Sequence, residues 1–81
     1  MDISISFYSY LKDLAGCACT TESVPEKTTL GDLVKQVMKR FPKLAPMEKS
    51  TLVAVGVEYQ DRRYVLKAGD EVSLFPPVQG G

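Results

Sequence analysis

The feature that most constrains the fold is one amphipathic stripe near the middle of the chain. Apolar residues recur at helical spacing from Leu30 to Phe41, with the others at positions 33, 34, 37 and 38, and this period places them on one face of an α-helix. Thr29 can cap the helix by accepting a hydrogen bond from the amide of Asp32, and Pro42 ends it. A helix with one apolar face needs a surface to cover, so we expect it to pack on a sheet.

Strand patterns lie on both sides of this helix. Residues 2–7 alternate, with Ile3, Ile5 and Phe7 on one face, which is typical of a half-buried strand. Residues 17–24 alternate poorly and are interpreted as a second strand at a sheet edge. Residues 71–75 alternate again and form the last strand.

The segment between the helix and the last strand is less regular. Residues 43–50 carry a proline and mixed charge and are interpreted as an irregular connection. Residues 52–57 form a nearly continuous apolar run, typical of a strand covered on both faces. Residues 58–63 are turn-like, and residues 64–66 are a short extended piece.

This order of elements predicts an α+β fold of the β-grasp, or ubiquitin-like, class. We expect a mixed sheet of four to five strands, with one main helix on one face and the first and last strands parallel in the middle. Residues 1–75 are interpreted as the β-grasp domain and residues 76–81 as a flexible C-terminal Gly-Gly tail.

Charge and cysteine content exclude several classes of function. Ten basic and ten acidic residues cancel, which argues against nucleic acid or an anionic membrane as a main partner. No transmembrane run or signal-peptide pattern is visible, so a cytoplasmic protein is expected. Cys17 and Cys19 are expected to be free thiols, because a C-x-C pair in a strand lies at or beyond disulfide reach. Without histidine, these two thiols cannot build a closed zinc or iron–sulfur site, so no metal site is predicted.

The last six residues point to the carboxyl end as the functional group. Pro76 and Pro77 end the strand and extend the chain, because neither can donate a ladder hydrogen bond. Gly80 and Gly81 then present a carboxylate on the least hindered backbone available, which suits entry into a narrow slot of another protein.

Two stretches near this end resemble the MoaD family, the small subunit of molybdopterin synthase within the MoaD/ThiS β-grasp superfamily. They are Leu66-x-x-Gly69-Asp70-Glu71-Val72 and Phe75-Pro76-Pro77-Val78-x-Gly80-Gly81. The resemblance spans essentially the whole chain, and its specific part is the last sixteen residues.

The resemblance implies a sulfur carrier without catalytic residues or a permanently bound cofactor of its own. It implies that Gly81 is adenylated by an E1-like enzyme with ATP and Mg²⁺, and is then thiocarboxylated with sulfur from a donor protein. The tail enters the large catalytic subunit of a heterotetramer, where sulfur passes to precursor Z, cyclic pyranopterin monophosphate. The inserting residues are Pro76, Pro77, Val78, Gln79 and Gly80.

Docking is expected on the sheet surface around Phe7 and Phe75, although the sequence leaves open whether Phe75 is an anchor or core. Two departures from the family bear on docking: Gly56-Val57-Glu58-Tyr59 replaces an expected asparagine, and Lys12 stands where arginine is common. The alternatives are a ThiS-like carrier of the thiazole pathway, a ubiquitin-like protein modifier, and a binding module with an inert tail.

Overall fold

The structure is a computed structural model that describes residues 1–77. In this range the chain forms five strands, two α-helices and one 3₁₀ helix. The elements in order are β1 (Asp2–Phe7), α1 (Tyr10–Ala15), β2 (Cys19–Ser23), α2 (Leu30–Arg40), η1 (Pro42–Met47), β3 (Leu52–Val55), β4 (Glu58–Tyr59) and β5 (Glu71–Phe75).

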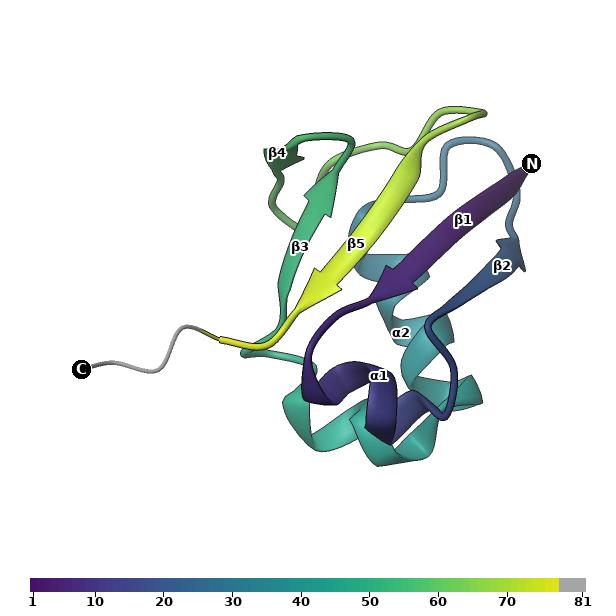
Figure 1. Cartoon of the computed structure of the whole chain (residues 1–81). Helices are drawn as coiled ribbons and strands as arrows, with labels where there is room; N and C mark the ends of the chain where they lie inside the picture. The colour runs from purple at the N-terminus through teal and green to yellow at the C-terminus, as the bar shows by residue number, and fades with distance from the viewer. Residues whose placement is uncertain (78–81) are drawn as a thin grey trace.

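The strands form one mixed sheet in the order β2-β1-β5-β3-β4, and α2 covers one of its faces (Figure 1). The last strand, β5, lies at the centre, parallel to β1 and antiparallel to β3. The β-grasp fold is therefore confirmed, including the parallel central pair and the edge position of β2. The face of the sheet that α2 does not cover is called the outer face below.

The core lies between α2 and the sheet, where the predicted stripe meets the inward residues of the strands. The α2 residues Leu30, Leu33, Val34, Val37 and Met38 are all buried. The predicted cap is present, because the Thr29 hydroxyl accepts from the Asp32 amide at 3.2 Å. Burying one such aliphatic side chain contributes about 1.5–3 kcal/mol, so the stripe anchors the whole helix.

Two predictions for the middle of the chain were wrong. The expected irregular connection contains η1, which opens at Pro42 because proline is favourable in a first helical turn. Residues 58–63, predicted to be turn-like, contain the short strand β4, whereas the predicted extended piece at residues 64–66 makes only an isolated bridge between Val65 and Thr29. Gly56, with a φ of 62°, makes the turn that pairs β4 back on β3.

Residues 62–66 instead cross the N-terminus of α2 and satisfy its first amides. The amides of Leu30 and Gly31 donate to the carbonyls of Tyr64 and Arg62 at 2.8 and 2.9 Å. A Cβ at Gly31 would stand 3.1 Å from the Arg62 carbonyl oxygen. Gly31 therefore lets the backbone of residues 62–64 approach the first turn of α2 closely enough to form these hydrogen bonds.

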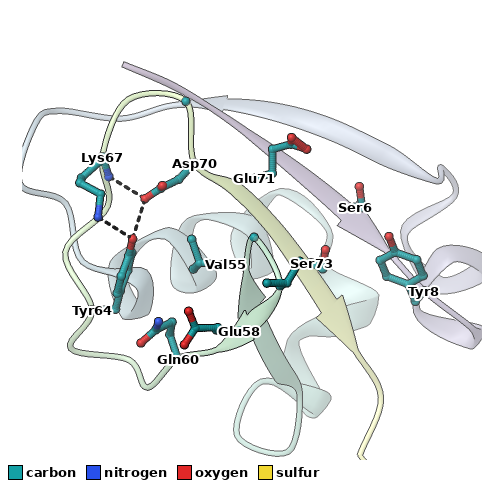
Figure 2. A pocket seen from close by; sticks show the side chains of 13 residues that line it. Ser6, Tyr8, Val55, Glu58, Gln60, Tyr64, Lys67, Asp70, Glu71 and Ser73 are labelled. Carbon is teal, nitrogen blue, oxygen red and sulfur yellow. Dashed lines mark hydrogen bonds between the residues drawn. The ribbon is translucent and has the colours of Figure 1, made fainter.

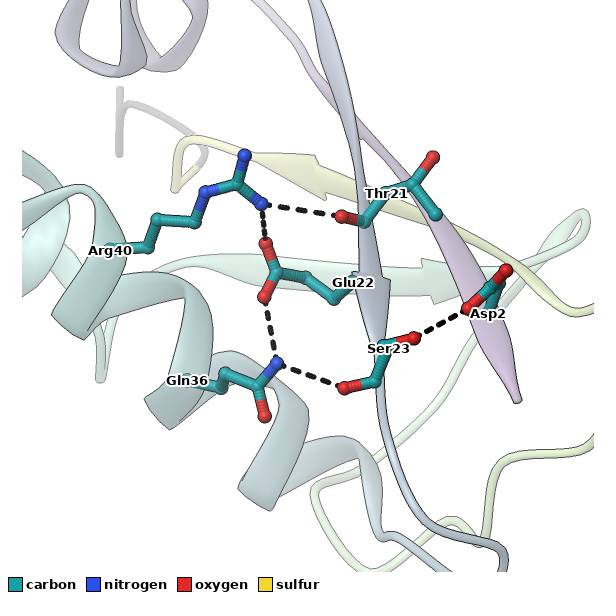
Figure 3. Close-up of polar contacts among 6 residues, drawn as sticks. All are labelled: Asp2, Thr21, Glu22, Ser23, Gln36 and Arg40. Atoms are coloured by element: carbon teal, nitrogen blue, oxygen red, sulfur yellow. Dashed lines mark hydrogen bonds and ion pairs between the residues drawn. The ribbon is translucent and has the colours of Figure 1, made fainter.

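A buried carboxylate ties the edge strand β2 to α2 (Figure 3). Glu22 is 5% exposed, accepts from Gln36 Nε2 at 2.7 Å and pairs with the guanidinium of Arg40. Arg40 also donates to the carbonyl of Thr21 at 3.2 Å. Both carboxylate oxygens are thus satisfied, as a buried charge requires.

Candidate functional site

Strand β5 divides its side chains between the two faces of the sheet. Val72 and Leu74 are buried in the core, whereas Glu71, Ser73 and Phe75 point to the outer face. Phe75 is half-buried and lies opposite Leu52 of β3. The sequence left open whether Phe75 is a core residue; the structure shows that Leu74 is the core residue and that Phe75 belongs to the outer face.

Because Phe75 points to the outer face, it joins a cluster of aromatic side chains at the end of β5. Tyr8 stacks on Phe75 with ring centroids 4.6 Å apart and planes at 13°, and Tyr59 meets Phe75 edge-on at 6.1 Å. Tyr8 is 45% exposed and Tyr59 67% exposed. Tyr8, Tyr59 and Phe75, called the aromatic cluster below, offer rigid apolar area with hydroxyl groups, a composition that favours protein interfaces.

Phe7, in contrast, is not available for docking, so its predicted role as a partner contact is corrected. It is 3% exposed and packs edge-to-face on Phe41 at 5.3 Å. Tyr8 takes its place on the outer face, and its amide donates to the Leu74 carbonyl at 3.1 Å. The alternation of β1 contains this signal, because Phe7 shares the face of Ile3 and Ile5, and the next residue must point the other way.

The tail leaves the domain beside the aromatic cluster. Pro76 and Pro77 follow β5 directly and are both half-buried, and neither has an amide proton with which to extend the ladder. The predicted inserting residues Val78, Gln79 and Gly80, and the predicted acyl site Gly81, lie outside the described residues.

An open groove of 660 Å³ runs along the outer face from Tyr8 to the loop before β5 (Figure 2). Ser6 and Ser73, which are paired across the parallel ladder, line it. Glu58 and Glu71 also line it, from β4 and β5. Sequence reasoning missed the groove because it assigned the outer face no role beyond Phe7 and Phe75.

The far end of the groove is held by a polar cluster of Tyr64, Lys67 and Asp70. The Tyr64 hydroxyl donates to Asp70 Oδ2 at 3.1 Å, and the Lys67 amide donates to the same oxygen at 2.8 Å. Lys67 Nζ donates to the Tyr64 hydroxyl oxygen at 3.1 Å. This hydrogen bond to Tyr64, together with the electrostatic effect of Tyr64 and Asp70, raises the pKa of Lys67 above its ordinary value.

The cysteines form no disulfide within residues 1–77. Cys17 and Cys19 are free thiols there, as predicted, with Cys17 half-buried and Cys19 exposed. No group of three or more metal-binding side chains comes together in these residues. None of the helices within them is long and apolar enough to cross a membrane.

Comparison with known proteins places the chain close to small sulfur-carrier subunits. The family model described as the ThiS family matches residues 5–81. A human protein named molybdopterin synthase sulfur carrier subunit is 30% identical over 82 residues, covering 98% of this chain and 93% of that protein. A protein of the same name from Chlamydomonas reinhardtii is 31% identical over 84 residues and covers both chains fully.

Solved structures share the fold over nearly the full length. SAMP1 from Haloferax volcanii superposes with a TM-score of 0.88 at 25% identity and covers 100% of both chains. A putative molybdopterin converting factor subunit 1 from Pyrococcus furiosus also gives a TM-score of 0.88, at 26% identity, covering 96% of this chain and 99% of that one.

Proposed function

Since the chain belongs to the ThiS family, we propose that it is the sulfur-carrier subunit of a molybdopterin synthase. The observation that carries this proposal is the delivery of the Pro76-Pro77 segment from the central strand, beside the exposed aromatic cluster. The relatives at 30% and 31% identity bear the same functional name. A rigid domain with a docking surface next to its reactive end suits a carrier that must serve several enzymes in turn.

The chemistry resides in the α-carboxylate of Gly81. In the proposed cycle a carboxylate oxygen attacks the α-phosphorus of ATP, held with Mg²⁺ in an E1-like enzyme, and pyrophosphate leaves. A sulfide equivalent from a sulfur-donor protein then attacks the acyl carbon, and AMP leaves. The product is a thiocarboxylate, whose sulfur the large subunit transfers to cyclic pyranopterin monophosphate. The carrier supplies the reacting group, and the catalytic side chains belong to its partners.

Docking gives this chemistry its efficiency. A thiocarboxylate tethered to a bound domain reaches the pocket as an intramolecular reactant, which raises its effective concentration without releasing free sulfide. We place the docking surface for the large subunit on the aromatic cluster, because exposed aromatic anchors dominate binding energy at such interfaces. A heterotetramer of two carriers and two large subunits is the proposed assembly.

The decisive experiment is the intact mass of the chain after incubation with an E1-like activating enzyme, ATP, Mg²⁺ and a sulfur donor. The expected product gains the mass of sulfur in place of one oxygen. A variant lacking Gly81 should melt like the wild type, because no residue of the domain is removed. It should not be loaded, because its new terminal carboxylate, on Gly80, lies one residue short of the position where the activating enzyme holds ATP. Loading of the truncated chain at the wild-type rate would contradict the proposal.

The mass experiment and one further assay with the large subunit separate two of the alternatives predicted from the sequence. A ubiquitin-like modifier would form an amide bond between the Gly81 carbonyl and a lysine amine, which appears as a conjugate of higher mass. A thiazole-pathway carrier would be loaded identically but would fail to convert cyclic pyranopterin monophosphate when mixed with the large synthase subunit.

A further inference from the structure

Strand β2 forms one edge of the sheet, because within residues 1–77 it pairs only with β1. At one end of this ladder the Phe7 amide donates to the Ala18 carbonyl at 2.8 Å. Hydrogen-bonded pairs alternate along an antiparallel ladder, so the pairs that contain Cys19, Thr21 and Ser23 are not hydrogen-bonded. The amides and carbonyls of these three residues therefore point away from β1, toward the open edge.

An open edge of this kind can pair with a strand of another molecule unless something blocks it. Proteins commonly block an edge with exposed charges, a proline, a bulge or an inward-pointing charge. Strand β2 contains no proline, and its register with β1 is unbroken. Its sole charged residue, Glu22, is 5% exposed and faces α2. Protection of this edge therefore depends on Glu22 and on the α2 side chains that meet it.

Two side chains of α2 reach the outward carbonyls of β2 (Figure 3). Arg40 donates to the Thr21 carbonyl at 3.2 Å, and Gln36 Nε2 donates to the Ser23 carbonyl at 3.4 Å. An added strand would bring an amide nitrogen to about 2.9 Å from the same oxygens, so it would compete with both donors. Glu22 holds the donors in place, because both also donate to its carboxylate. Moving them aside would leave a buried charge without its partners, which is unfavourable.

We propose that Gln36 and Arg40 guard the edge of β2 and prevent it from pairing with β2 of a second copy of this chain. A second copy fits an unguarded edge because an antiparallel pair centred on Thr21 is self-complementary. Cys19 of each copy would face Ser23 of the other, and all the outward residues would exchange both ladder hydrogen bonds. The side chains of these residues are exposed, small and uncharged, so no like-charge repulsion opposes the pairing.

The test measures the mass of full-length variants by sedimentation equilibrium over a range of concentrations. Gln36→Ala with Arg40→Ala removes the guard. Val37→Ala is the control for lost stability, because it truncates a buried residue of the same helix and leaves both donors in place. Adding Thr21→Pro to the guard variant removes an outward amide that the ladder with β1 does not use, and should therefore block pairing between copies. Thermal melts establish which variants are folded.

A further variant covers the case in which the guard variant does not fold. Glu22→Val, added to the two alanine changes, removes the buried carboxylate that would otherwise lose its partners. Replacing every member of a buried polar network by apolar groups costs little stability. This triple variant also lacks the guard, so it should associate in the same way.

Wild type and the Val37→Ala control should keep the 8.9 kDa mass of one chain, whereas the guard variant should approach twice that mass as its concentration rises. Hydrogen exchange of the Thr21 amide, followed by NMR, should slow in the associated guard variant because the amide gains a partner. Thr21→Pro should restore the mass of one chain. A folded variant without the guard that keeps this mass would overturn the inference. Equal association of Val37→Ala, or association that survives Thr21→Pro, would overturn it as well.

Discussion

Leu74 and Phe75 are neighbours on opposite faces of β5, so truncating each to alanine should separate stability from docking. Leu74 is 1% exposed in the core, and such a truncation costs about 2–5 kcal/mol. At about 4–8 °C of melting temperature per kcal/mol for a domain of this size, the midpoint should fall by at least about 8 °C. Phe75 is half-buried and loses two aromatic contacts worth about 0.5–1.5 kcal/mol each.

Binding should show the opposite order. As a hot spot at the docking surface, Phe75 should contribute about 2 kcal/mol or more to the binding free energy. Phe75→Ala should therefore raise the dissociation constant for the large subunit about thirtyfold or more. Leu74→Ala should bind the large subunit almost as tightly as wild type, provided that binding is measured at a temperature at which its thermal melt shows it to be folded. Thermal melts and calorimetry on both variants give the comparison. A Phe75→Ala chain with unchanged affinity would refute the assignment of the aromatic cluster as the anchor.

Three further variants test other parts of the structure. Changing Cys17 and Cys19 to serine should leave sulfur loading, measured by intact mass, at the wild-type level, because a thiocarboxylate needs no thiol in the carrier. A double variant that folds but cannot be loaded would contradict this. Glu22→Ala should lower the unfolding free energy by about 1–3 kcal/mol in urea melts, because Gln36 and Arg40 of α2 lose their buried acceptor. An unchanged urea midpoint would show that these contacts do not stabilise the fold. Tyr64→Phe should bring the pKa of Lys67, followed by NMR titration, back toward its ordinary value, because the Tyr64 hydroxyl is the main cause of the rise. The stability that Lys67 contributes is present below the unfolded-state pKa and is lost as pH rises through the folded-state pKa, so the wild type and variant should differ in pH dependence only at the alkaline end; an unshifted pKa in the variant would contradict the assignment.

Local signals were sufficient for the elements that hold the core. The stripe of α2, its Thr29 cap and the alternation of β1 and β5 depend on residues a few positions apart, and the structure confirms them. The order of these elements was enough to predict the parallel pair at the centre. Strand β4 was missed because two residues are too few to show an alternating pattern, and its existence depends on the turn at Gly56 and on pairing with β3.

The site was predicted less well because it depends on phase and on distant pairs. Neighbouring residues of β1 point to opposite faces of the sheet. The prediction of Phe7 as the anchor therefore selected a core residue, whereas Tyr8, the next residue, lies on the outer face. The burial of Glu22 could not be predicted from its own neighbours, since its partners lie 14 and 18 residues away on α2. The groove likewise combines β1, β5 and the loops around β4.

The central place of β5 gives the domain a mechanical property. The strand is bonded along both sides, to β1 and to β3, through four residue pairs on each. A pull on the chain beyond Phe75 acts along the strand, so it shears both ladders together and cannot open them one bond at a time. Core strands of this kind open only at a free-energy cost close to that of unfolding the whole domain. A partner can therefore grip and draw the tail taut with little yielding of the fold behind it.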